Sequence, residues 1–217
     1  MADAILGNQL FTHYDRAHVA QLCEQAQLLQ RALEHYTDIF DIKRAIVHTH
    51  LLKPEWLVEY FGSLSVDDSL ECLKAMLTAN LRQNLQICVQ VAGKYHEQLG
   101  TTKLIELFES FKSFEGLFYF LGSIVNFSQE AEVHFRYIQA ACKTGQIKEV
   151  ERICRESSCY DPERVKNFLK EAKLADQLPL IIVCDRLDVI SNRLFILFGH
   201  PVIIPLYSPS AIRLIEI

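Results

Sequence analysis

The sequence predicts an all-α protein, an α-solenoid of stacked antiparallel helical hairpins. Apolar residues recur three and four positions apart along most of the chain, which is the period of an amphipathic helix. Residues that cap helix N-termini precede many of these segments, and glycine or short polar loops follow them. Each segment is too short to bury its apolar face alone, so neighbouring helices are expected to stack on one another.

The first half of the chain is expected to contain a series of short helices. Residues 17–24 and 28–36 form the first clear helical hairpin, with Asp15 as the N-cap of the first helix. Ser65 and Asp68 resemble a capping box, in which a hydroxyl and a carboxylate bond the free amides of a first turn. The other helices expected here are residues 4–10, residues 41–47, a helix that begins at Pro54, and an apolar pattern that continues through Leu81 to Gly100.

Residues 105–127 are rich in aromatic side chains at helical spacing. Gly116 and Gly122 are expected to mark bends in this segment. The spacing favours an interdigitated core, and a groove for a partner is the alternative interpretation. The aromatic residues concerned are Phe108, Phe111, Phe114, Phe118, Tyr119 and Phe120.

Residues 135–186 are predicted to form three or four short helices in succession. Gly145 ends the first, because glycine accepts the left-handed conformation of a helix C-terminus. Asp161 and Pro162 begin a later helix as its N-cap and first turn. The apolar stripe expected on that helix is Val165, Phe168, Leu169 and Ala172, and the stripe expected on the helix after Asp176 is Leu178, Ile181 and Ile182.

The helical period fades after Leu187, so the solenoid is expected to span residues 1–187. Pro201, Pro205 and Pro209 follow Gly199, and prolines at this spacing remove amides and clash with a preceding helical turn. Residues 188–217 are therefore predicted to be a divergent, irregular tail that is poorly ordered or caps the solenoid imperfectly.

The composition excludes several classes of protein. A net charge of −5 with interspersed acids and bases offers no basic stripe for nucleic acid, so no nucleic-acid partner is expected. No apolar run approaches the roughly 20 residues of a membrane-spanning helix, and the first residues do not resemble a secretory signal. Seven cysteines at irregular spacing favour a reducing compartment over a disulfide framework.

No group of residues has the spacing that catalysis or metal binding requires. His48 and His50 lie on different faces of a helix, and no C-x-x-C motif accompanies Cys72 or Cys88. Gly122-Ser123 lacks the second glycine of a nucleophile elbow. Cys154 and Cys159 are too far apart for a redox pair, the sequence after Gly145 is too short for a phosphate loop, and Glu106, Glu109 and Glu115 suit the wet face of a helix. We therefore expect no catalytic, cofactor-binding or metal-binding residues, no cofactor, and no enzyme activity.

Several long stretches resemble the leg of the clathrin heavy-chain family. YIQAACKTGQIKEVER at residues 137–152 and YDPERVKNFLKEA at residues 160–172 carry the resemblance most strongly. FTHYDRAH at residues 11–18 and LIELFESFKSF at residues 104–114 are also similar to that family. The resemblance extends over residues 1–186 and implies a solenoid of helical hairpins.

The resemblance implies a structural role in clathrin-coated pits and coated vesicles. The chain would be a helical rod that contributes to the packing of triskelion legs in intracellular and endocytic vesicle transport. Its implied partners are other heavy-chain legs, bound weakly and repeatedly in a lattice at the cytosolic face, without insertion into the membrane. The light-chain and trimerisation regions of the family are not recognisable here. The alternative is a free-standing helical-repeat module that binds another protein, which an exposed apolar patch would favour.

Overall fold

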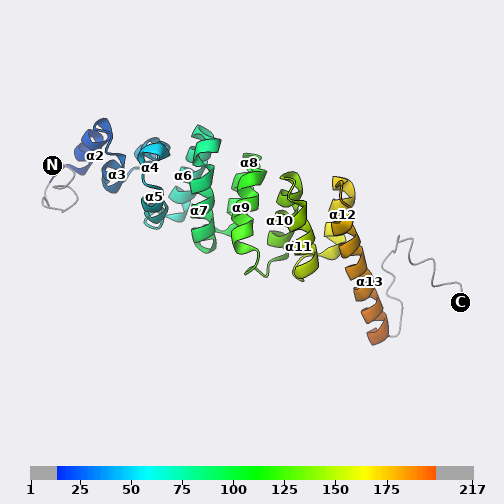
Figure 1. Ribbon diagram of the computed structural model, residues 1–217. Helices are drawn as coiled ribbons and strands as arrows, with labels where there is room; N and C mark the ends of the chain where they lie inside the picture. The colour runs from blue at the N-terminus through cyan, green and yellow to red at the C-terminus, as the bar shows by residue number, and fades with distance from the viewer. Residues whose placement is uncertain (1–13, 199–217) are drawn as a thin grey trace, which may run out of the picture. The chain divides into compact units, whose positions relative to one another are not determined.

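The structure, a computed structural model, describes the backbone of residues 14–198 and the side chains of residues 14–188. This part of the chain contains twelve α-helices and one short 3-10 helix, and no strand (Figure 1). The chain divides into two compact units, Met1–Ser128 and Gln129–Ile217. The predicted all-α fold is therefore confirmed for the described residues.

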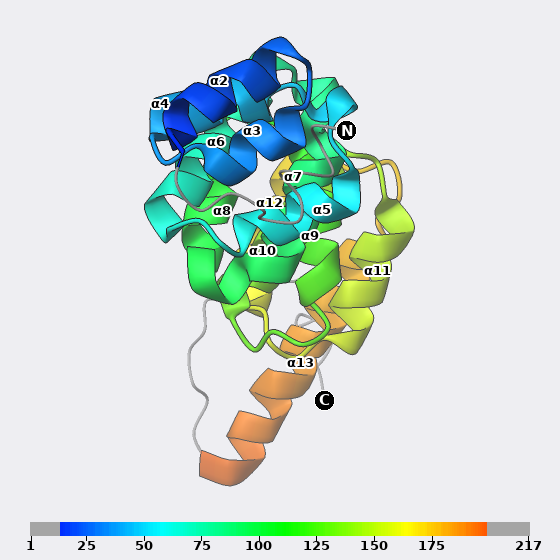
Figure 2. The same cartoon turned by 90° about the vertical axis from the view of Figure 1, so that its left-hand side faces the viewer.

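The helices of the first unit pack in the pattern of stacked hairpins. Consecutive helices contact each other, as α2 does α3 and α6 does α7, and alternate helices also meet, as α4 does α6 and α7 does α9. Figure 2 shows α2, α3 and α4 together. The helices are α2 (Arg16–Gln25), α3 (Leu29–His35), α4 (Ile39–Ile46), η1 (Thr49–Leu51), α5 (Pro54–Phe61), α6 (Val66–Ala79), α7 (Leu81–Leu99), α8 (Thr101–Ser110) and α9 (Phe114–Ile124).

Polar side chains cap the N-termini of several of these helices. Asp15 accepts hydrogen bonds from the amides of Ala17 and His18, at 3.0 and 3.2 Å. Ser65 Oγ accepts from the Asp68 amide at 3.1 Å, so the predicted start of α6 at Ser65 is confirmed. The Asp68 carboxylate accepts from the Ser65 hydroxyl at 2.7 Å, so the second half of the capping box takes a different form from the one predicted. Asn80 caps α7 in the same manner, a role that the sequence analysis missed because the apolar pattern continues across it.

The aromatic segment is two helices, and its break lies elsewhere than predicted. The turn between α8 and α9 contains Lys112, whose φ is +52°. Gly116 and Gly122 lie inside α9, so the prediction that they mark bends is wrong. Phe108 and Phe120 are buried with their ring centroids 5.8 Å apart, which confirms a core role for these two aromatics. Tyr119 is exposed.

The second unit contains α10 (Ala131–Lys143), α11 (Ile147–Glu156), α12 (Pro162–Ala172) and α13 (Leu178–Phe198). Within it, α10 contacts α11 and α12, and α13 contacts α11 and α12. Gly145, two residues after the end of α10, has φ +74°, the left-handed conformation predicted for it. Asp161 accepts from the amides of Glu163 and Arg164 and confirms the predicted start of α12.

The apolar faces of the last two helices differ from those predicted. On α12, Val165 and Leu169 are buried but Phe168 is only half-buried, with its ring 5.8 Å from that of Phe135. On α13, Leu178 and Ile181 are 38% and 52% exposed, so the predicted stripe is wrong. Its buried residues are Pro179, Val183 and Leu187, at intervals of one helical turn. The sequence could not distinguish the two faces because both carry large apolar side chains.

Helix α13 crosses the expected boundary between Leu187 and Asp188 without a break and reaches Phe198. Gly199 is the first residue outside the described part of the chain at this end. The prolines at 201, 205 and 209 also lie outside it, as does the helix predicted at residues 4–10. The irregular tail and its boundary remain predictions.

Candidate interaction surface

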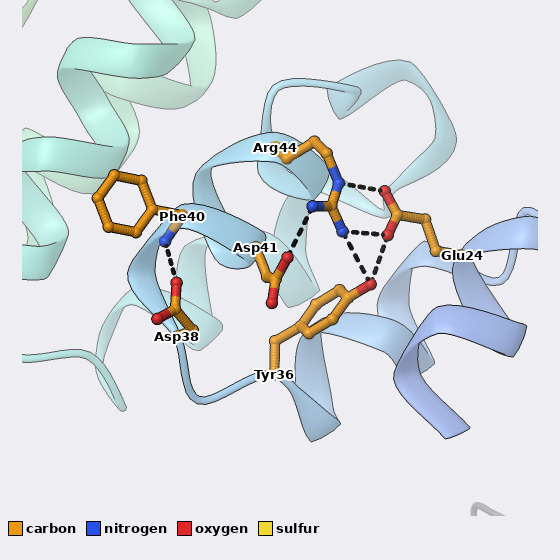
Figure 3. A network of polar contacts seen from close by, with 6 residues as sticks. All are labelled: Glu24, Tyr36, Asp38, Phe40, Asp41 and Arg44. Carbon is orange, nitrogen blue, oxygen red and sulfur yellow. Dashed lines mark hydrogen bonds and ion pairs between the residues drawn. The ribbon is translucent and has the colours of Figure 1, made fainter. Parts of the chain in front are cut away.

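A network of polar side chains joins the first three described helices. Arg44 of α4 donates from Nε to Glu24 Oε1 at 3.0 Å and from Nη2 to Glu24 Oε2 at 2.7 Å. The same guanidinium donates to Tyr36 Oη at 3.2 Å and to Asp41 Oδ1 at 2.6 Å. Tyr36 Oη donates in turn to Glu24 (Figure 3). The two parallel bonds to Glu24 make this a bidentate pair, the arrangement that holds both partners most firmly.

Burial and charge maintain the protonation states that the network requires. The guanidinium of Arg44 lowers the pKa of Glu24 despite partial burial, so this carboxylate stays ionised. Burial and the neighbouring Glu24 raise the pKa of Tyr36 to about 12, so its hydroxyl remains a donor. Because Tyr36 is bonded to α2 and α4 together, its ring is fixed at the C-terminal end of α3.

An open groove of about 630 Å³ lies beside this network, and we call it the Trp56 groove. It is formed by the C-terminal end of α3, one residue of α4, one face of α5 and the start of α6. Its lining residues are Leu33, Glu34, Tyr36, Thr37, Ile42, Trp56, Glu59, Tyr60, Ser63, Leu64, Ser65 and Asp68. Tyr36 thus belongs to both the network and the groove.

Aromatic rings form one wall of the Trp56 groove. Trp56 and Tyr60 are one helical turn apart on α5 and stack with their ring centroids 5.1 Å apart and an interplanar angle of 21°. Tyr60 Oη donates to the backbone oxygen of Leu33 at 3.2 Å, which joins α5 to α3. Burial raises the pKa of Tyr60, so this hydroxyl also remains protonated. Both rings are only half-buried and expose surface to the groove.

The charged residues of the groove lining are all acidic. Glu34, Glu59 and Asp68 contribute three carboxylates, and no lysine or arginine is among the lining residues. Glu34 pairs through Oε2 with Arg31 at 2.8 Å, and Glu59 pairs through Oε1 with Lys94. Asp68 accepts from the Ser65 hydroxyl at 2.7 Å through Oδ2. Each carboxylate is therefore held in place through one of its two oxygens.

Polar contacts in the second unit bind its helices together. Glu132 of α10 accepts from Arg136 Nε at 2.7 Å and from Arg164 of α12. The guanidinium of Arg164 also lies 3.8 Å from the centroid of the Phe135 ring. Arg164 lowers the pKa of Glu132, so the carboxylate remains charged. These contacts support the packing of α10 on α12.

The residues considered for metal binding do not converge. His48 and His50 flank and enter the 3-10 helix, with ring centroids 6.1 Å apart and nearly perpendicular planes. Cys72 and Cys88 are buried in α6 and α7, and burial raises the pKa of each thiol to about 12. Within the residues that the structure describes, no group of three or more histidine, cysteine or acidic side chains could hold a metal ion.

The other residues considered for chemistry are buried, form local hydrogen bonds or lie exposed on helices. Cys154 is buried, and Cys159 is a half-buried thiol that donates to the Gln129 side chain at 3.5 Å. Ser123 donates to the backbone oxygen of Phe120 at 2.6 Å, inside α9. Glu106 and Glu115 are exposed on their helices, as expected. None of the described helices is long and apolar enough to cross a bilayer.

The network and the groove were not found from the sequence. Tyr36 is the last residue of the helix predicted at residues 28–36, but its partners Glu24 and Arg44 lie twelve residues before it and eight after it, on other helices. Trp56 and Tyr60 fall in the helix predicted to begin at Pro54, and their spacing of four was the available signal for a stacked pair.

Comparison with known proteins identifies the family. The family model described as "Region in Clathrin and VPS" matches residues 2–85 and 92–192. The human protein named clathrin heavy chain 2 is 75% identical over all 217 residues, and the Drosophila melanogaster clathrin heavy chain is 74% identical over the same length. The chain spans 13% and 12% of the lengths of these two relatives. A probable clathrin heavy chain of Schizosaccharomyces pombe is 60% identical over 92% of the chain and 12% of its own length. The chain therefore belongs to the clathrin heavy-chain family.

Proposed function

We propose that this chain is a structural segment of a clathrin coat, acting in intracellular and endocytic vesicle transport. The observation that carries the proposal is the identity of 74–75% over all 217 residues to proteins named clathrin heavy chain. The helical stacking supports it, because helices that contact both their next and next-but-one neighbours form a semi-rigid support. The proposed role is mechanical and requires no catalytic residue.

The proposed partners are other heavy-chain legs in a coat lattice at the cytosolic face of coated pits and vesicles. Such contacts are individually weak and gain strength by repetition, because each further contact is effectively intramolecular once the first has formed. Exposed charged side chains, including Arg155 and Glu156 on α11, suit contacts of this kind. No direct insertion into the membrane is proposed, and the light-chain and trimerisation functions of the family are not assigned to this segment.

Sedimentation with preassembled clathrin cages tests this role. We expect the chain to enter the cage pellet weakly, in proportion to its concentration, and to remain in the supernatant without cages. Weak binding is expected because a single segment lacks the repeated contacts of a complete lattice. Cage formation by the isolated chain, or its absence from the pellet at every concentration, would contradict the proposal.

A free-standing protein-binding module is the second candidate function. The Trp56 groove favours it, because a preformed groove with exposed aromatic rings is a common feature of peptide-binding sites. The two functions make different demands on the chain: a coat segment needs contacts with other legs, whereas a module needs an occupant for the groove. Cage sedimentation in the presence of a groove-binding peptide separates the two functions. The peptide should release the chain from the cages only if the chain acts as a module that binds through the groove.

A further inference from the structure

We propose that the Trp56 groove binds a segment of another protein that presents a lysine or arginine next to a large apolar side chain. This inference is independent of the proposed coat function, since it rests on the residues that line the groove. It assigns to the first unit a peptide-binding site with a defined chemical preference.

Charge complementarity identifies the basic part of the occupant. The groove is lined by Glu34, Glu59 and Asp68 and by no cationic residue. The cations that pair with Glu34 and Glu59, Arg31 and Lys94, lie outside the lining. These contacts use one oxygen of each carboxylate, and a carboxylate can accept from more than one donor. An anionic segment would meet like charge, which costs free energy and disfavours binding.

The aromatic wall identifies the apolar neighbour and adds to recognition of the cation. The exposed faces of Trp56 and Tyr60 attract a cation through their π systems, and tryptophan does so most strongly. Leu33, Ile42 and Leu64 line the same groove and supply an apolar surface. A segment with adjacent basic and apolar side chains can use both surfaces, whereas a purely basic segment would leave the apolar surface wet.

The rings of Tyr36 and Tyr60 are both held in place before any ligand binds. Tyr36 is bonded to Glu24 and Arg44, as Figure 3 shows, and Tyr60 is bonded to the Leu33 backbone. Ordering flexible side chains at an interface costs free energy on binding, so fixed rings reduce that cost. The groove is therefore suited to a short segment that brings few contacts of its own.

Selection from a display library of random short peptides tests this inference with the full chain. Peptides retained by the wild-type chain are expected to share a lysine or arginine beside leucine, isoleucine or phenylalanine. Trp56 is the sole tryptophan of the sequence, so its fluorescence reports occupancy of the groove by each synthesised peptide. Binding is expected to weaken as salt is added, because the carboxylates are solvent-accessible.

A pair of double variants distinguishes binding at the groove from a general effect of the chain's negative charge. Glu34→Gln with Glu59→Gln removes two groove carboxylates and should weaken binding of the selected peptides about tenfold. Glu97→Gln with Glu106→Gln removes the same charge at exposed positions of α7 and α8 outside the groove lining, and should leave the affinity unchanged. Circular dichroism of both variants verifies that the helices remain folded.

Three results would overturn the inference. The first is selected peptides that lack basic residues, and the second is equal loss of affinity in both double variants. The third is self-association of the chain in sedimentation that the groove variant abolishes and the control variant preserves. That result would make a second copy of this chain the occupant of the groove.

Discussion

Arg186 joins α13 to the C-terminal end of α11 and the residue that follows it. Its Nη1 donates to the backbone oxygen of Ser157 and, at 3.5 Å, to that of Cys154. Its guanidinium also lies 5.2 Å from the centroid of the buried Tyr160 ring, whose hydroxyl donates to the same Cys154 oxygen at 2.7 Å. One side chain on α13 thus satisfies two carbonyl groups of another segment.

Replacing Arg186 by methionine is expected to destabilise the second unit by about 1–3 kcal/mol. Methionine retains the length of the stem but has no donor, so the Ser157 oxygen loses the guanidinium while the Cys154 oxygen keeps the Tyr160 hydroxyl. Urea unfolding followed by circular dichroism measures the loss. Arg155→Met is the control, because its pair with Glu151 is exposed and should contribute less than about 1 kcal/mol. Equal effects of the two variants would show that Arg186 acts only as a surface charge.

His35 is a buried titratable group without a hydrogen-bond partner at either ring nitrogen in the described part of the chain. It is 9% exposed and lies edge-on to Tyr14, with ring centroids 5.6 Å apart. Burial lowers its pKa, and the positive charge of Arg16 lowers it further, while Glu34 acts in the opposite direction. The fold therefore favours neutral His35.

Stability is expected to fall as the pH is lowered through the range in which unfolded histidine is protonated. In the unfolded chain, His35 binds a proton near pH 6.5, about the ordinary histidine value. In the folded chain, His35 binds this proton only at lower pH. The contribution of His35 is thus fully present above that value and is lost below it. Thermal unfolding of the wild type and His35→Leu between about pH 7.5 and about pH 5.5 measures the difference. A wild-type curve that declines no more steeply than the variant's would contradict this assignment.

At the scale of elements, Gly116 allows α9 to approach its neighbours closely. A methyl group at this position would lie 2.7 Å from Leu85 Cδ1 of α7, 2.8 Å from Ser113 Oγ and 2.9 Å from Phe108 Cδ1 of α8. The sequence predicted a bend at Gly116, but the role of this residue is close packing inside a helix.

Gly116→Ala is expected to lower the stability of the first unit by up to about 2 kcal/mol. Overpacking usually costs about 1–3 kcal/mol, and the gain of about 1 kcal/mol that alanine brings to a helix interior offsets part of that cost. Denaturant titration of the variant decides between the two effects. A more stable variant would show that Leu85 and Phe108 move aside at little cost.

Local signals of the sequence predicted helix ends better than helix faces. Asp15, Ser65 and Asp161 cap the helices expected of them, because capping depends on amides two or three residues away. The face of α13 was misassigned because its burial depends on α11 and α12, which pack on Pro179 and Val183 and leave Ile181 in water. The polar network and the groove escaped prediction for the same reason, since each combines residues from three or more helices.

At the scale of the whole molecule, the expected boundary at Leu187 makes a prediction about the C-terminal residues. Among the described side chains of α13, the buried ones are Pro179, Val183 and Leu187, and Arg186 bonds the Ser157 oxygen; all four lie at or before that boundary. A chain truncated after Leu187 retains these contacts. We therefore expect its thermal midpoint to stay within about 4 °C of that of the full chain, which is the shift produced by roughly 1 kcal/mol in a protein of this size.

A second truncation, after Phe198, serves as the matched comparison because it keeps the whole of α13. If residues 188–217 are a divergent tail, both shortened chains should unfold at the midpoint of the full chain. They should also be more soluble, because the removed sequence is rich in leucine and isoleucine. A lower midpoint only for the chain ending at Leu187 would instead place residues 188–198 in the packed unit and move the boundary to the end of α13. A loss of stability in both chains would show that residues 199–217 contribute to the core and would refute the tail.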